Sequence, residues 1–395
     1  MFTESEQEMW SDPVPEEKLR LKDHEIDEKY ERGEDRIVTE SNREKLPNFV
    51  QAMKNPGYMD VRPFYQRRAR WDPKKQSKLI ESFIMNVPVP PVFLYEKKFN
   101  QYEVMDGQQR ITAIKEFYDN KLKLVGLESW SELNGRTYLT LPTKVKAGVD
   151  RRSLSSIVLM KESAPDEETD WLLKRMVFER LNTGGQKLSQ QEIRNCLYYG
   201  ELNKRLLKLA EYPAFRQIWG IPDLPVPEGE EPPSQLANDQ YFKDMGDAQL
   251  VLRFFALRHW ERFRGAMQDF LDRYMIRSKK FNAEDYQKLD KLFKETIDTC
   301  KEVFGDLVFR PYEPDNDEWG AKPQASFADS VMVAISDQLM NKEKLLGKKR
   351  ELINGTQRLF QENPAKTFTG AANTRNDVQN RIKLYCDMVN SIVQD

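Results

Sequence analysis

The spacing of hydrophobic residues divides this chain into a part that contains strands and a longer part that is mainly helical. In the first part, Leu79, Ile80, Phe83 and Ile84 lie on one face of a predicted helix. Prolines follow that helix and end it, and the next apolar run, residues 92–95, predicts a short strand. This region therefore combines both kinds of regular structure.

A second strand is predicted directly before another helix. The sequence QYEVMDG at 101–107 is typical of a strand that ends in a glycine. Ile111, Ile114 and Phe117 then recur at helical spacing. The predicted order is strand, tight turn, helix, and the turn has the sequence DGQQR.

The remaining elements are predicted to be helices. Residues 168–212 have a helical pattern that breaks at the NTGG sequence of 182–185 and resumes at a capping box, Ser189 with Glu192. Further helices are predicted at 247–274, at 283–304, at 324–341 and from about 374. The last of these carries an apolar stripe of Val378, Ile382, Tyr385, Val389 and Ile392.

Composition and proline content place the expected domain boundaries. The predicted fold class is α+β, with an N-terminal α+β domain followed by a mostly α-helical C-terminal domain. The expected parts are an acidic, flexible leader (1–36), a domain that holds the DGQQR turn (37–165), a helical NTGG region that completes the site (166–221), a proline-rich acidic loop (222–240) and an α-helical domain (241–395).

The overall composition excludes several classes of protein. The net charge is only −2 at pH 7, so any contact with nucleic acid must come from a local basic surface. The three cysteines lie far apart and suit a reducing cytoplasm, and no apolar run is long enough to span a membrane. The two histidines, His24 and His259, are too far apart in sequence for an HNH or zinc site. We therefore expect a cytoplasmic protein with no membrane partner.

The DGQQR turn is the strongest candidate site. Gly107 lets the backbone turn sharply, and the helix that follows begins with N–H groups that attract an anion. Arg110 adds a guanidinium that suits two phosphate oxygens. Gln108 and Gln109 can orient a water or hold a sugar, and Asp106 can ligate a divalent cation or cap the helix. The alternative is a capped turn with surface glutamines.

A basic, aromatic stretch at 61–76 is the second candidate. Cations mixed with aromatic rings suit a surface that follows a nucleic-acid backbone and stacks on its bases. The alternative is that Tyr65 and Trp71 belong to the core while the arginines form a solvated edge. The basic residues expected to contact nucleic acid are Arg62, Arg67, Arg68, Arg70, Lys74 and Lys75.

Two further sequences carry weaker signals. The NTGG sequence of 182–185 can form a loop whose N–H groups hold an anion, or it can simply end a helix at a glycine. Arg375 and Arg381 lie near the start of the last predicted helix, where they either bind an anion or are simply surface residues.

Together and in this order, three stretches resemble a known family. They are YQRRARWDPKKQSKLIESFIMNVPVPPVFLY, YEVMDGQQRITAIKEFYDNKL and VFERLNTGGQKLSQQEIRNCLYYG. They are similar to the DGQQR family, whose domain forms the N-terminal part of GmrSD-type modification-dependent restriction endonucleases and related phage-defence proteins. The similarity is strongest over residues 45–200.

The resemblance implies a ParB/sulfiredoxin-like N-terminal domain with a nucleotide site. In that family the DGQQR turn binds a nucleoside triphosphate (ATP or GTP, with Mg²⁺) and is linked to its hydrolysis, which controls nucleic-acid cleavage. By position, the catalytic residues would be Asp106, Gln108, Gln109 and Arg110, with Asp106 as the metal ligand. The further nucleotide-binding residues would be Gly107, Gln66, Arg67, Asn182 and Thr183.

The chain departs from the larger members of the family because it has nothing like their His-containing nuclease domain. We therefore expect a standalone NTPase that senses DNA in phage defence, with a separate effector protein or further copies of itself as partners. The alternative is a non-catalytic, ParB-like DNA-binding module in which nucleotide acts as a clamp switch. A third hypothesis is an unrecognised nuclease site at Glu96, Lys97 and Lys98.

Overall fold

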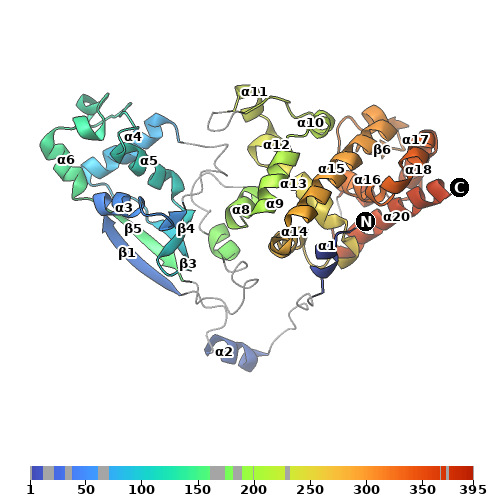
Figure 1. Cartoon of the computed structure of the whole chain (residues 1–395), viewed down its shortest axis with the longest axis horizontal. Helices are drawn as coiled ribbons and strands as arrows, with labels where there is room; N and C mark the ends of the chain where they lie inside the picture. The colour runs from blue at the N-terminus through green and yellow to red at the C-terminus, as the bar shows by residue number, and fades with distance from the viewer. Residues whose placement is uncertain are drawn as a thin grey trace. The chain divides into compact units, whose positions relative to one another are not determined.

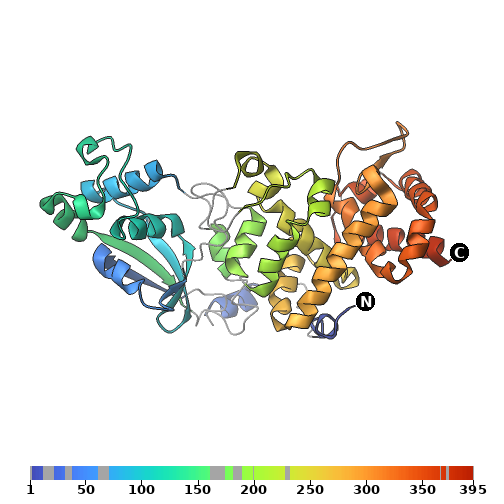
Figure 2. The same ribbon diagram turned by 45° about the horizontal axis from the view of Figure 1, so that its top comes forward.

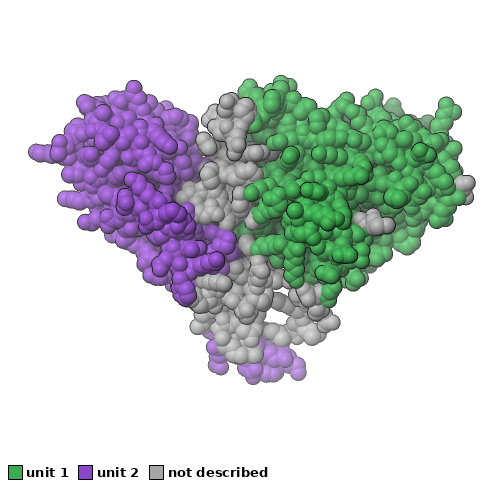
Figure 3. All heavy atoms as spheres, in the orientation of Figure 1, with its two compact units in different colours: residues 1–17, 189–395 green, residues 18–188 purple. Residues whose placement is uncertain are grey.

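The computed structural model describes residues 2–11, 22–31, 38–60, 71–160, 174–180, 189–198, 200–226, 232–364, 366–370 and 373–394. The chain divides into two compact units, which Figure 3 shows in different colours. One unit is Lys18–Leu188, and the other combines Met1–Glu17 with Ser189–Asp395.

The Lys18–Leu188 unit, which is unit 2 in Figure 3, is built on a mixed sheet of five strands (Figure 1). The order of the strands is β1-β5-β3-β4-β2, with β1 and β2 at the edges. The β1·β5 and β3·β4 pairs are antiparallel, whereas β3·β5 and β2·β4 are parallel. The strands are β1 (Thr39–Lys45), β2 (Met59–Asp60), β3 (Val92–Lys98), β4 (Gln101–Asp106) and β5 (Ser153–Leu159).

Helices cover one face of this sheet and form the core with it. Val92 and Leu94 of β3 point into that core together with Leu154 and Val158 of β5. On the other face, the ammonium of Lys174 lies 3.3 Å from the ring centroid of Tyr95, so the helix at 174–180 contacts that side. The helices of this unit also include α2 (Asp23–Glu31), α3 (Leu46–Ala52), α4 (Pro73–Met85), α5 (Gln108–Tyr118) and α6 (Thr143–Asp150).

The unit that combines Met1–Glu17 with Ser189–Asp395, unit 1 in Figure 3, is almost entirely helical (Figure 2). Helix α16 packs against α13, α15 and α20, and a small hairpin joins Tyr312–Glu313 to Glu318–Trp319. Its helices are α1 (Glu4–Glu8), α8 (Gln190–Leu197), α9 (Glu201–Leu209), α10 (Pro213–Trp219), α11 (Ser234–Ala237), α12 (Gln240–Lys243), α13 (Gly246–Leu257), α14 (Met267–Arg277), α15 (Ala283–Phe304), α16 (Ala325–Asp337), α17 (Lys342–Gly347), α18 (Lys349–Glu362), α19 (Lys366–Thr369) and α20 (Arg375–Gln394). The predicted fold class, α+β with a helical C-terminal region, is confirmed.

Several helix predictions are confirmed, and others need correction. The helix predicted at 283–304 is α15, and the predicted Ser189–Glu192 capping box starts α8. The helix predicted at 247–274 is instead two α-helices, α13 and α14, with a short 3-10 turn between them. Gly265, with a φ of 72°, lies in that break, where a glycine is favoured.

The N-terminal residues differ from the expected flexible leader. Residues 2–11 pack into the helical unit, where Glu6 is 1% exposed and its carboxylate lies 2.6 Å from the Arg258 guanidinium. Trp10 stacks on Phe270, with ring centroids 5.4 Å apart. Acidic composition alone suggested a solvated segment, but one buried carboxylate and its partner hold this part in place.

Among the described residues, no helix is both long and apolar enough to cross a membrane.

Candidate site at the DGQQR turn

Gly107 forms the junction between strand β4 and helix α5. Its φ of +91° lies in the left-handed region, which favours glycine. A Cβ built at this position would lie 2.5 Å from Cγ1 of Val92 on the neighbouring strand and 3.1 Å from Nη2 of Arg110. The predicted strand, tight turn and helix are therefore confirmed, and the space at the turn requires glycine.

Helix α5 is held against the core by the residues that the sequence pattern indicated. Ile111, Ile114 and Phe117 are each 0% exposed. The first intrahelical bond runs from the N–H of Ile111 to the Gly107 carbonyl, at 2.9 Å. Gly107 has no side chain to cap the helix, so the start of α5 carries the partial positive charge of a helix N-terminus.

Arg110 bridges three groups around the turn. Nη2 donates to Asp106 Oδ2 at 2.6 Å, and Nη1 donates to the Pro90 carbonyl at 2.7 Å and to the Pro91 carbonyl at 3.2 Å. Its side chain is 13% exposed, whereas that of Asp106 is 51% exposed. The guanidinium therefore ties the start of β3 to the end of β4, and Asp106 would compete with an anion for it.

Gln109 connects the turn to the end of the basic, aromatic stretch. Its Oε1 accepts the backbone N–H of Trp71 at 3.0 Å. Trp71 is partly buried and packs against the core, as in the alternative that assigned it to the core. One hydrogen bond thus joins two of the candidate segments, the DGQQR turn and the basic, aromatic stretch. The sequence pattern did not reveal this contact.

The predicted nucleic-acid residues are only partly within the described structure. Lys74 and Lys75 are exposed in the first turn of α4, which is capped by Asp72. Positive charge is unfavourable at a helix N-terminus, so these lysines do not stabilise α4. The other predicted nucleic-acid residues, Arg62, Arg67, Arg68 and Arg70, lie outside the described residues. So do three predicted nucleotide-binding residues, Gln66, Asn182 and Thr183.

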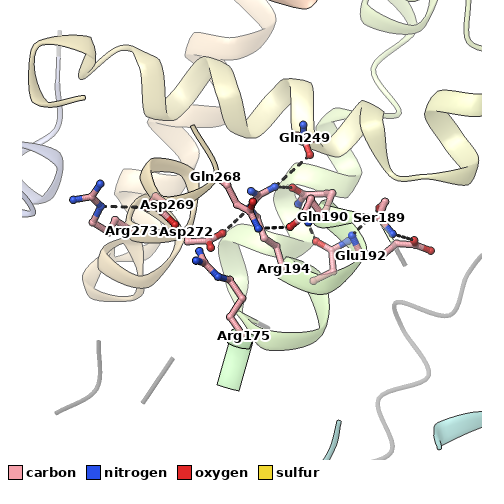
Figure 4. Close-up of polar contacts among 12 residues, drawn as sticks. Arg175, Ser189, Gln190, Glu192, Arg194, Gln249, Gln268, Asp269, Asp272 and Arg273 are labelled. Carbon is pink, nitrogen blue, oxygen red and sulfur yellow. Dashed lines mark hydrogen bonds and ion pairs between the residues drawn. The ribbon is translucent and has the colours of Figure 1, made fainter. Parts of the chain in front are cut away.

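Helix α8, which follows the NTGG sequence, carries a buried polar network that sequence analysis missed (Figure 4). The Arg194 guanidinium donates from Nε to Asp272 Oδ1 at 2.6 Å, and both side chains are nearly inaccessible. Nη1 of Arg194 also donates to Gln191 and Gln249, at 3.3 Å each. The polar sequence QQEIRN resembles a surface helix, and its burial depends on partners far away in sequence.

Arg381 is also buried. Arg253 forms a two-point ion pair with Asp329, and Arg381 lies 3.8 Å from the same carboxylate. Burial lowers the pKa of Arg381, which is 0% exposed, while Arg375 is exposed. The surface interpretation therefore fits Arg375 but not Arg381.

Glu96 has a structural role. Its carboxylate accepts the N–H of Asn100 at 2.9 Å inside the β3–β4 hairpin, and the side chain is buried. Within the described structure, no group of three or more His, Cys, Asp or Glu residues is arranged to hold a metal ion. A Mg²⁺ ion at Asp106 would therefore depend on phosphate oxygens and water for its other ligands.

Comparison with known families gives a match that covers the turn. Residues 46–199 match the family described as GmrSD restriction endonuclease, N-terminal domain. Comparisons with curated proteins and with solved structures give no match. The matched segment runs from α3 through the DGQQR turn to α8. Residues 46–199 thus belong to the GmrSD-type N-terminal domain family.

Proposed function

We propose that this chain binds and hydrolyses a nucleoside triphosphate at the DGQQR turn and uses that reaction in a restriction or phage-defence response to DNA. The restriction context comes from the family match over residues 46–199. The single observation that carries the nucleotide site is the position of Gly107, which keeps side-chain volume away from the start of α5 beside the Arg110 guanidinium.

The turn has the chemistry that a phosphate group requires. The N-terminus of α5 supplies main-chain N–H groups and a partial positive charge, and Arg110 supplies a planar, permanently charged fork. These groups converge because Arg110 lies one helical turn after Gly107, so both face the same end of the helix. A triphosphate carries enough negative charge to displace Asp106 from Arg110.

Asp106 would then become available for a different task. Its side chain is about half exposed and belongs to the last residue of β4, so it is able to turn toward solvent. When bound, Mg²⁺ would neutralise phosphate charge, with Asp106 as its protein ligand. Gln108, on the first turn of α5, would orient a water near the terminal phosphate.

The DNA-binding part of the proposal rests on the lysines at the start of α4. Lys74 and Lys75 are exposed, and the neighbouring Trp71 is tied to the turn through Gln109. A rearrangement of the turn on nucleotide binding would therefore reach the chain segment that leads into these lysines. This connection suits a protein in which DNA and nucleotide influence each other.

The decisive experiment measures nucleotide binding and phosphate release together. Wild-type protein and the Arg110→Ala variant are titrated with ATP and GTP, with Mg²⁺ and with and without duplex DNA. We expect Arg110→Ala to lose at least about tenfold in affinity, the cost of one charge-assisted hydrogen bond or more. Arg136→Ala is the control, because Arg136 is another arginine of the same unit and its side chain, within the described structure, bonds only to the Thr140 carbonyl.

Arg110→Ala also removes bonds to the two proline carbonyls, so Arg110→Lys is measured beside it with thermal unfolding of all variants. A folded Arg110→Lys protein with weakened binding supports the site. Binding without phosphate release would identify a nucleotide-controlled switch and not an NTPase. Equal binding by wild type and both variants would contradict the nucleotide site itself.

A further inference from the structure

A cavity of about 250 Å³ lies beside the edge strand β1, in the same unit as the DGQQR turn but lined by none of its residues. It is smaller than the roughly 300–1,000 Å³ sites that take drug-sized ligands, so its occupant must be small. The lining residues are Asn42, Arg43, Glu44, Phe49, Tyr58, Leu94, Tyr102, Leu154, Ser156 and Val158.

The strand register separates the side chains that face the cavity from those that do not. Asn42 pairs with Ser156 and Glu44 pairs with Leu154 in the antiparallel ladder of β1 and β5. Because side chains alternate along a strand, Asn42 and Glu44 share the core-facing side with Leu154. Arg43 pairs with Ser155 and points to the opposite side, so its backbone lines the cavity and its charge lies away.

The cavity has an apolar floor. Phe49 of α3, Leu94 of β3, and Leu154 and Val158 of β5 are all buried and belong to the hydrophobic core. These side chains offer no hydrogen-bond donor or acceptor. A ligand that fills this part of the cavity must itself be apolar there.

The polar end of the cavity consists of one carboxylate and two phenols. Within the described structure, the Glu44 carboxylate has no hydrogen bond and no ion pair, although it is half-buried on the core-facing side of β1. The rings of Tyr58 and Tyr102 meet edge to face, with centroids 5.5 Å apart. Burial raises the pKa of Glu44, and burial with the nearby Glu44 charge raises the pKa of Tyr58.

We infer that this cavity binds a primary alkylammonium group, with the ammonium at Glu44 beside the rings of Tyr58 and Tyr102 and the alkyl chain on the apolar floor. An ammonium has three donors, and Glu44, the tyrosine hydroxyls, Asn42 and Ser156 are acceptors for them. Aromatic faces attract a cation in addition.

The charges around the cavity favour a cation over an anion. Glu40 and Glu96 act on Tyr102, whose pKa is raised by burial and by these two carboxylates. Glu40 also lies on the same side of β1 as Glu44, at the register position opposite Val158. The Arg43 side chain points away from the cavity, so no cation of the lining competes with the ligand.

The same geometry has a second explanation that the experiment must separate. Carboxylates that point inward from an edge strand discourage pairing with another chain. Under that explanation Glu40 and Glu44 are equivalent, no amine binds, and either substitution promotes self-association. Under our inference Glu44 differs from Glu40, because only Glu44 lines the cavity.

The test uses the full chain with methyl-labelled Leu and Val, and follows the NMR signals of Leu94, Leu154 and Val158. The probes are n-butylammonium chloride, the neutral 1-butanol, and a capped Gly-Lys-Gly peptide with its Gly-norleucine-Gly counterpart. We expect saturable shifts with butylammonium and weaker ones with butanol. Binding of the free amine but not the lysine peptide identifies a small amine as the ligand, and equal or tighter peptide binding identifies a lysine side chain.

Three variants make the assignment specific, and thermal unfolding confirms that each one folds. Glu44→Gln should weaken butylammonium binding about tenfold or more, because it removes a charge-assisted hydrogen bond. Tyr58→Leu should weaken it about two- to fivefold through the lost cation–π contact. Glu40→Gln removes the same charge nearby and should change affinity about twofold or less. Absent shifts, equal binding of butanol, or equal effects of Glu40→Gln and Glu44→Gln overturn the inference, whatever happens at the nucleotide site.

Discussion

The Arg110 guanidinium and the Asp106 carboxylate form an ion pair 2.6 Å long across the turn that joins β4 to α5. Both residues are candidates for the nucleotide site, and in this arrangement their side chains bind each other. If a nucleotide binds as proposed, this pair competes with its phosphate groups for Arg110, and the energy of the exchange depends on what replaces each partner.

This competition predicts opposite effects of Asp106→Asn with and without Mg²⁺. Without the metal, the substitution removes a negative charge that repels phosphate and frees Arg110, so ATP or GTP should bind more tightly, by about tenfold or less. With Mg²⁺, the loss of the carboxylate ligand should weaken binding. Calorimetric titration at fixed ionic strength measures both constants.

Asp119→Asn provides a matched control for this reversal. Asp119 forms an ion pair with Lys115, which is also four residues away, and the pair is also 2.6 Å long. Asp119 lies just beyond the other end of α5. Its substitution should leave both binding constants unchanged. If Asp106→Asn shifts affinity in the same direction with and without Mg²⁺, Asp106 is not a metal ligand.

Gly107→Ala should strongly destabilise the N-terminal unit. The residue would have to adopt a φ of +91° and place its Cβ 2.5 Å from Val92. Backbone strain and overpacking together should cost about 2–4 kcal/mol, measured by thermal or urea unfolding. Gly148→Ala in α6 is the control, because a Cβ there meets nothing within 4 Å. It should stabilise the protein by up to about 1 kcal/mol.

A Gly107→Ala protein as stable as wild type would show that the turn adopts another conformation. Loss of nucleotide binding by a Gly107→Ala protein that is still folded would, in contrast, assign the glycine a role in ligand approach as well as in the backbone.

The DGQQR turn could be predicted because its determinants are local in sequence. The strand at 101–106, the glycine and the apolar spacing of α5 lie within 18 residues, 101–118, and each constrains the next. The stripe on α20 was predicted for the same reason, with one error: Val393, not Ile392, is the last buried residue. A straight helix has 3.6 residues per turn, so the stripe drifts toward the later position.

The contacts that could not be predicted join residues far apart in the chain. Glu6 and Arg258 are separated by 252 residues, and Gln109 and Trp71 by 38. Glu6 lies in an acidic segment, so the sequence does not indicate that it is buried until its partner Arg258 is known. The Asp106–Arg110 ion pair is local in sequence, but it depends on side-chain conformations that the order of the residues does not specify.

A single oxygen of Glu81 holds the loop between α5 and α6. Its Oε1 accepts the N–H groups of Glu128, Ser129 and Trp130 at 3.1, 2.8 and 3.0 Å. Glu81→Gln retains an acceptor but loses its charge, so the free energy of unfolding should fall by about 1–2 kcal/mol. Urea unfolding measures the change.

Glu128→Gln is the matched control for Glu81→Gln. Glu128 pairs with Lys78 at 2.7 Å, but both side chains are largely exposed. Water screens such a pair, so the unfolding midpoint should not change measurably. Equal effects of the two substitutions would mean that the three N–H groups find another acceptor when the Glu81 charge is removed.

Glu6→Gln should release the N-terminal segment from the helical unit. The Glu6 carboxylate lies 2.6 Å from Arg258 and 3.5 Å from His259, in a site that excludes water. Breaking a buried ion pair of this kind should cost about 3 kcal/mol. Limited proteolysis and thermal unfolding measure the release, and Glu4→Gln, at an exposed position of the same helix, should have no such effect.

The same cluster should make the stability of the helical unit fall as the pH falls. Burial lowers the pKa of His259 below its ordinary value of 6.5, so the unfolded chain takes up a proton first and stability declines below about that pH. Burial alone would raise the pKa of Glu6, but His259 and Arg258 together hold it below 4.5, which adds a second decline in more acidic solution. His259→Phe keeps the ring that stacks on Phe2 and leaves Arg258 beside Glu6, so it should remove the first decline and reduce the second without abolishing it. Urea unfolding between pH 7.5 and about 4 measures both steps. A wild-type protein whose stability does not change between pH 7.5 and 5.5, or a His259→Phe variant with an unchanged profile, would show that the pKa of His259 is the same in the folded and unfolded states.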